Sequence, residues 1–162
     1  PESRKEQGLV LGMTGAHNIS LASLSRISHP FLDLGSEKRI ADESFSRLSI
    51  RPAEPRNRVV NLSGGNQQKV VLAKWLMRDC DVLLFDEPTR GIDVGAKFQI
   101  YSIIVELAKA GKAVVVSSSE IDEINGICNR VLVMRRGRIA VEYADKDVNR
   151  ESILAAISGN FE

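Results

Sequence analysis

Residues 62–69 read Leu-Ser-Gly-Gly-Asn-Gln-Gln-Lys, and one helix length later residues 82–89 read Val-Leu-Leu-Phe-Asp-Glu-Pro-Thr. Ser63 is a good N-cap for a helix. Gly64 and Gly65 keep side chains away from the first main-chain N–H groups, and the positive end of the helix dipole favours an anion there. The first stretch therefore predicts a helix whose start a phosphate can approach.

The second stretch predicts a buried strand, because the apolar run 82–85 is short and bounded by polar residues. Asp86 and Glu87 follow at its carboxyl end, where open α/β sheets bind ligands. Two acids after a strand can equally be solvated side chains without a role. Taken alone, the pair leaves both interpretations open.

Strand and helix patterns alternate along the chain. Val70, Ala73 and Met77 mark the inner face of the helix after Ser63, with Lys69 and Lys74 turned outward. Residues 1–19 are punctuated by glycine and predict a loop. The other predicted elements are helices over 36–45, 94–110 (capped by Asp93), 121–128 and 149–157, and strands over 113–116, 131–134 and 139–141. This order predicts an α/β fold with a parallel, doubly wound sheet.

The composition is that of an ordinary soluble domain: 162 residues, 43% hydrophobic, 27% charged and a net charge of +1. The charge gives no general attraction to nucleic acid, and no apolar run approaches the roughly 20 residues of a membrane helix. We expect the chain inside the cell. The two cysteines, Cys80 and Cys128, are too few for a disulfide framework or a zinc site, and His17 and His29 stand apart.

Three motifs carry a resemblance to a known family. Ser63-Gly64-Gly65, the strand ending in Asp86-Glu87, and Gly91-Ile92-Asp93 resemble the signature motif, the Walker B motif and the D-loop of ABC-transporter ATPases. Asn66 and the stretches 69–76 and 89–97 resemble the second nucleotide-binding domain of the bacterial ATPases that import ribose, galactose, xylose or arabinose. Such proteins carry two of these domains in one chain.

The resemblance implies a P-loop NTPase fold that is incomplete at its N-terminus and carries a small helical subdomain. Residues 1–19 resemble a Q-loop segment, with Glu2 where the glutamine would fall and Ser3 for an aspartate. Four segments follow from the comparison: 1–19 (Q-loop-like), 20–58 (helical subdomain and linker), 59–142 (signature helix, Walker B, D-loop and switch region) and 143–162 (C-terminal helix).

The resemblance also implies roles for individual residues. ABC domains pair head to tail, so Ser63, Gly64, Gly65 and Gln67 would contact ATP in the site across the interface. Asp86 would act through Mg²⁺ and Glu87 by orienting or activating water, both in the domain's own site. Gly91 and Asp93 would lie at the seam between the two sites.

Two departures from the family pattern matter. No Gly-x-x-x-x-Gly-Lys-Ser/Thr motif occurs, so we expect the C-terminal part of a domain that is inactive in isolation. Ser119 stands where active domains have a switch histidine, and a hydroxyl lacks the reach and charge of imidazole. The domain's own site is therefore expected to be weak, and the pair of sites asymmetric.

The implied function is coupling of ATP hydrolysis to monosaccharide import at the cytoplasmic face of the membrane. The implied partners are a second nucleotide-binding domain fused upstream, transmembrane permease subunits and, indirectly, a sugar-binding protein, with no nucleic acid. Two alternatives stay open: a soluble ABC ATPase of DNA repair or translation, and a non-catalytic truncated remnant. The absence of a coiled-coil insertion and the presence of Asn66 argue against the first.

Overall fold

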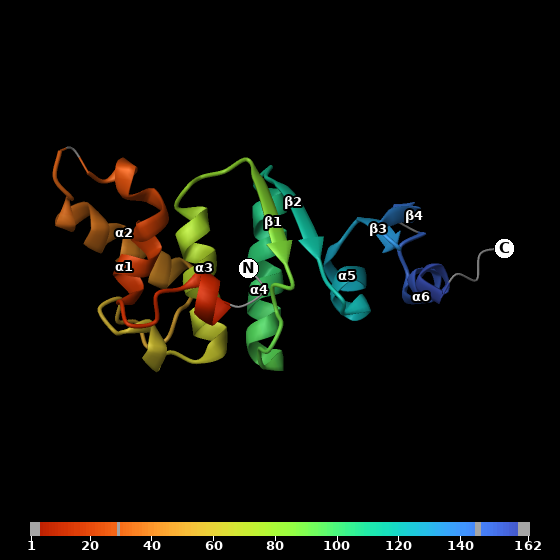
Figure 1. The fold of residues 1–162 in the computed structure, drawn as a ribbon, viewed down its shortest axis with the longest axis horizontal. Helices are drawn as coiled ribbons and strands as arrows, with labels where there is room; N and C mark the ends of the chain where they lie inside the picture. The colour runs from red at the N-terminus through yellow and green to blue at the C-terminus, as the bar shows by residue number, and fades with distance from the viewer. Residues whose placement is uncertain (1–3, 29, 145–146, 159–162) are drawn as a thin grey trace. The chain divides into compact units, whose positions relative to one another are not determined.

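The computed structural model describes residues 4–28, 30–144 and 147–158 (Figure 1). The predictions for Glu2, Ser3 and His29 lie outside these residues. The described elements are η1 (Arg4–Gly8), α1 (Gly15–Ser20), η2 (Leu21–Arg26), α2 (Leu34–Arg47), η3 (Val59–Asn61), α3 (Gly64–Leu76), β1 (Val82–Asp86), α4 (Val94–Lys109), β2 (Ala113–Ser117), α5 (Ile121–Ile127), β3 (Arg130–Arg135), β4 (Arg138–Ala144) and α6 (Arg150–Ser158). They form two compact units, Pro1–Val115 and Val116–Glu162.

The predicted loop over 1–19 is wrong, because helical turns occupy part of it. Thr14 caps α1 by accepting a hydrogen bond from the N–H of His17 at 3.2 Å. The fully buried amide of Asn18 accepts from the N–H of Val10 at 2.8 Å and donates to its carbonyl at 3.0 Å. One buried side chain therefore orders the glycine-punctuated segment that precedes it.

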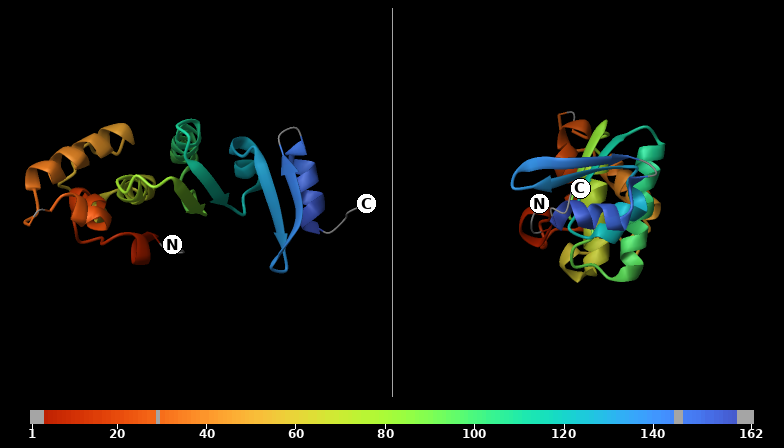
Figure 2. Two further views of the ribbon diagram at one scale, coloured as in Figure 1. Left: turned by 90° about the horizontal axis from the view of Figure 1, so that it is seen from above. Right: turned by 90° about the vertical axis from the view of Figure 1, so that its right-hand side faces the viewer.

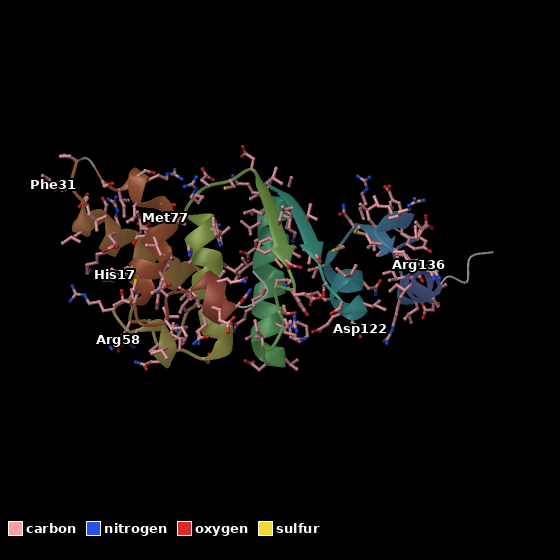
Figure 3. All side chains as sticks on the ribbon, in the orientation of Figure 1. His17, Phe31, Arg58, Met77, Asp122 and Arg136 are labelled. Carbon is pink, nitrogen blue, oxygen red and sulfur yellow. The ribbon has the colours of Figure 1, made fainter. Side chains whose placement is uncertain are left out.

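Helices α1, α2 and α3 pack together in the first unit. Their shared core includes Ile19, Phe45 and Val70, each at most 2% exposed. Asp33 caps α2 by accepting from the N–H groups of Gly35 and Ser36, which places the helix start two residues before the predicted one. Phe31, in the loop that precedes α2, is 84% exposed and projects outward (Figure 3).

Strands β1 and β2 pair in one sheet, joined through α4. Their arrows point the same way in Figures 1 and 2, as expected for a strand–helix–strand crossover. β1 is less buried than predicted: Leu83 is 8% exposed, but Val82 is 58% and Leu84 is 76% exposed. These two apolar side chains therefore stay largely exposed among the described residues.

Strands β3 and β4 form a separate antiparallel hairpin, which follows the strand–helix–strand part of the chain. The reason for the antiparallel pairing is the two-residue turn at Arg136 (φ 50°) and Gly137 (φ 76°). So short a connection with both φ angles positive can join only antiparallel neighbours. Val131 and Val133 pack with Ile153 and Ala156 of α6 to form the core of the second unit.

Candidate functional site

The start of α3 is held by a short chain of hydrogen bonds. Ser63 caps the helix, its Oγ accepting from the N–H of Asn66 at 3.4 Å and from Asn66 Nδ2 at 2.9 Å. Asn66 Oδ1 in turn accepts from the N–H of Arg51 at 2.9 Å. The Ser63 cap is therefore confirmed, and Asn66 ties it to the segment that precedes η3.

Gln67 lies one turn into α3 and is 5% exposed. Its Nε2 donates to the carbonyls of Val59 and Leu62, each at 3.1 Å. Its Oε1 is buried and accepts no hydrogen bond from any residue the structure describes. The amide thus anchors η3 against the helix, and the contact of Gln67 with nucleotide stays a prediction.

Lys69 is buried rather than turned outward, which corrects the sequence interpretation. It is 3% exposed, and its Nζ donates to the carbonyl of Ser49 at 2.9 Å. Burial lowers the pKa of Lys69, the charge of Arg51 lowers it further, and the carboxylate of Asp93 raises it. A buried cation of α3 therefore contacts the turn after α2.

The carboxylate pair sits where the sequence placed it, at the carboxyl end of β1. Asp86 is the last residue of the strand and is exposed, and Glu87 follows with φ 46°. A left-handed backbone is uncommon for a residue other than glycine and recurs at functional sites. Pro88 and Thr89 are buried directly after it, so the turn that presents both acids is anchored.

The segment after this turn brings Gly91 and Asp93 to the start of α4. Gly91 has φ 69°, and Asp93 caps α4 by accepting from the N–H of Ala96 at 3.0 Å. Gly65 is in contact with this segment: a Cβ on it would lie 3.5 Å from Cγ2 of Ile92 and 3.7 Å from Oδ2 of Asp93. The start of α3 and the residues predicted as the D-loop are therefore neighbours.

Ser119 lies in the second unit, is exposed and follows the end of β2. The residue before it has a defined role that sequence reasoning missed. Ser118 Oγ donates to the carboxylate of Glu123, which is 3% exposed, and accepts from the N–H of Glu120 at 3.0 Å. This pair shapes the turn that carries Ser119 into α5.

A groove runs between α3 and β1 within the first unit. Its volume is about 360 Å³, and its lining includes the apolar side chains of Val71, Trp75 and Leu84 together with Asp86. The groove presents more apolar than polar surface, so it suits protein packing better than a charged ligand.

A magnesium nucleotide is compatible with these residues only in part. Among the described residues no group of three or more His, Cys, Asp and Glu could enclose a metal ion. Mg²⁺ in nucleotide sites is held by one or two carboxylates together with phosphate oxygens and water, so the exposed Asp86 is sufficient from the protein side. The phosphate groups would need donors that this chain does not carry as a P-loop motif.

Solved structures with the same fold are ATP-binding cassettes. A dimeric cassette in a post-hydrolysis state, bound to ADP and phosphate, matches with a TM-score of 0.73 at 22% identity, over 86% of this chain and 60% of that one. A metal-chelate type ABC transporter in an inward-facing conformation matches with a TM-score of 0.77 at 17% identity, over 91% of this chain and 59% of that one. The fold is that of a P-loop NTPase of the ABC type.

The family model described as ABC transporter matches residues 4–90, more than half of the chain. The chain belongs to the ABC transporter family. It is 48% identical to a xylose import ATP-binding protein of Moorella thermoacetica, over 98% of this chain and 32% of that protein. It is also 48% identical to an arabinose import ATP-binding protein of Rhizobium meliloti, over 96% of this chain and 31% of that protein.

A ribose import ATP-binding protein of Clostridium perfringens is 42% identical, over 98% of this chain and 32% of that protein. The chain thus spans about a third of the length of the curated relatives it matches. The predicted resemblance to sugar-import ATPases is confirmed.

Proposed function

We propose that the chain is part of the ATP-binding subunit of a monosaccharide importer and supplies its signature motif to an ATP site on a second nucleotide-binding domain. The observation that carries the proposal is the Ser63-capped start of α3, with two glycines in its first turn. Its free N–H groups and helix dipole suit a phosphate that other residues already hold. The names of the relatives favour sugar import over DNA repair or translation.

In the domain's own site, Asp86 would hold Mg²⁺ and Glu87 would orient or activate water for attack on the terminal phosphate. Bound Mg²⁺ would neutralise charge on the phosphates. The turn at Glu87, with its left-handed φ of 46° and the buried Pro88 and Thr89 behind it, fixes where the carboxylate is presented. Ser119 would approach the same nucleotide as a neutral hydroxyl.

The proposed permease contact lies on the helical subdomain. Phe31 and Leu34 are 84% and 67% exposed at the loop before α2 and the start of that helix. Two large apolar side chains exposed within four residues of sequence suit a protein interface. No described helix is both long enough and apolar enough to cross a bilayer. The names of the relatives favour a chain that lies at the cytoplasmic face against permease subunits.

Calorimetric titration of the 162-residue chain with MgATP tests the first part of the proposal. We expect no binding in the micromolar range, because the signature residues add contacts only to a phosphate held elsewhere. Micromolar binding by this chain alone would contradict the proposal. Uptake of labelled ribose, xylose, arabinose and galactose by vesicles containing the assembled transporter tests the second part, and transport of none of them would contradict it.

A further inference from the structure

Gly65 lies where the first turns of α3 and α4 approach each other closely. The two helices contact each other and run in the same direction (Figure 1). A Cβ on Gly65 would lie 2.7 Å from the Cβ of Ala96. Two methyl carbons cannot approach so closely, and the Cβ of Ala96 is attached directly to the α4 backbone, so it cannot rotate away.

Ala96 is itself fixed in place. Its N–H is the donor that Asp93 Oδ1 accepts at 3.0 Å, so it belongs to the capped first turn of α4. Gly65 is buried within the equally capped first turn of α3, two residues after Ser63. The contact therefore joins two rigid helix starts, one from the signature motif and one from the segment after Asp86.

We propose that Ala96 is a positioning residue: its methyl group sets the separation of the two helix starts and is the reason that residue 65 is glycine. Under this inference the two signature glycines differ in role. Gly64 leaves room for the phosphate, whereas Gly65 leaves room for Ala96. A shift of the segment around Asp93 would move the start of α3 directly, because no gap separates them.

Exchanging the methyl group across the contact tests this inference. Gly65→Ala places two methyl groups in one space and should lower the melting temperature of the chain by roughly 3–10 °C, the usual effect of overpacking in a protein of this size. Ala96→Gly removes the obstacle. The double variant Gly65→Ala/Ala96→Gly carries one methyl group at the contact and should recover most of the loss.

Gly126→Ala on α5 is the matched control, because a Cβ there meets no atom within 4 Å. It should leave the melting temperature unchanged or raise it, since alanine favours helix. If Gly65→Ala behaves like Gly126→Ala, or costs as much stability in the Ala96→Gly background as in the unaltered chain, the inference is wrong. If Gly65→Ala fails to fold, recovery of a folded double variant supports the inference and its failure contradicts it.

The functional part rests on the proposed function and is measured separately. In the assembled transporter, Gly65→Ala should lower the rate of ATP hydrolysis at least tenfold. The double variant should hydrolyse ATP several-fold faster than Gly65→Ala. Restored melting temperature without restored hydrolysis would show that phosphate contact, not Ala96, requires glycine at 65. Absence of hydrolysis in the unaltered transporter would instead contradict the proposed function and leave the melting-temperature result standing.

Discussion

The ammonium group of Lys69 donates to the main-chain carbonyl of Ser49 at 2.9 Å while its side chain is 3% exposed. Ser49 has φ 49°, a conformation uncommon for a residue other than glycine, and the lysine takes the turn's inward-facing carbonyl as its partner. A buried cation thus holds the turn after α2 against α3.

The burial of Lys69 predicts that the free energy of unfolding depends on pH. Burial lowers the pKa of Lys69 from its usual 10.5, so between the folded pKa and 10.5 the unfolded chain binds more protons than the folded one. Stability should therefore rise with pH across that window. Lys69→Met should remove this rise, measured as the free energy of unfolding in urea from pH 7 to pH 10. Lys109→Met, at the exposed end of α4, should keep it. An identical pH profile of stability in both variants would show that Lys69 does not cause the rise.

Asn66 bridges the N-cap and the segment before η3. We therefore expect a longer amide side chain at this position to lower the stability of the fold. Asn66→Gln should lose the bonds to Ser63 Oγ and to the N–H of Arg51, at a cost of about 1–2 kcal/mol in the free energy of unfolding. Asn125→Gln, at an exposed position of α5, is the control and should change little. A loss no larger than that of the control would show that the bridge does not stabilise the helix start.

The Ser118–Glu123 pair should stabilise the second unit. Ser118→Ala removes a hydroxyl donor from a carboxylate that is 3% exposed, and such a loss costs about 1–3 kcal/mol. Ser158→Ala, which removes an exposed hydroxyl bonded to the carbonyl of Leu154, should cost less than about 0.5 kcal/mol. Urea denaturation followed by circular dichroism compares the two, and equal effects would contradict the prediction.

The same substitution should affect stability at only one of the two adjacent leucines of β1. Leu83→Ala opens a cavity at a position 8% exposed and should cost about 2–5 kcal/mol. Leu84→Ala truncates a side chain that is 76% exposed, so it should leave stability nearly unchanged and reduce aggregation measured by light scattering. Unchanged aggregation of the Leu84 variant would show that this face of β1 does not drive aggregation.

Local patterns predicted the elements well, because caps and apolar runs are encoded within a few residues. The helix predicted over 94–110 is α4, Val94–Lys109, and the strand predicted over 113–116 is β2, Ala113–Ser117. Long-range contacts were not predictable in the same way. Nothing near Lys69 indicates a carbonyl twenty residues earlier, and nothing near Gly65 indicates the methyl group of Ala96.

The structure brings the start of α3 and the segment around Asp93 together. It does not place Ser119 relative to them. A Cβ built on Gly65 would contact Ile92 and Asp93 of the same chain, whereas the head-to-tail pairing of two domains stays a prediction. Ser119 belongs to the second unit, so its approach to the carboxylates stays a prediction. Ser118 could have been suspected from its position directly after an apolar strand, but its partner Glu123 could not.

We propose that the chain gives its signature motif to a better ATP site and its carboxylates to a weaker one. Gly64→Asp would set a carboxylate against a phosphate at contact distance, a repulsion of several kcal/mol in a shielded site. At ~1.4 kcal/mol per decade, hydrolysis should fall by orders of magnitude. Gly64 is chosen because any side chain on Gly65 also meets Ala96. Under the proposed function Glu87→Gln would affect only the site that has Ser119 in place of histidine, so its loss should be small.

The deciding measurement is steady-state ATP hydrolysis by the two single variants in reconstituted transporter. We expect the Gly64→Asp transporter to be inactive and the Glu87→Gln transporter to stay largely active. Near-complete and equal losses in both variants would contradict the asymmetric pair of sites.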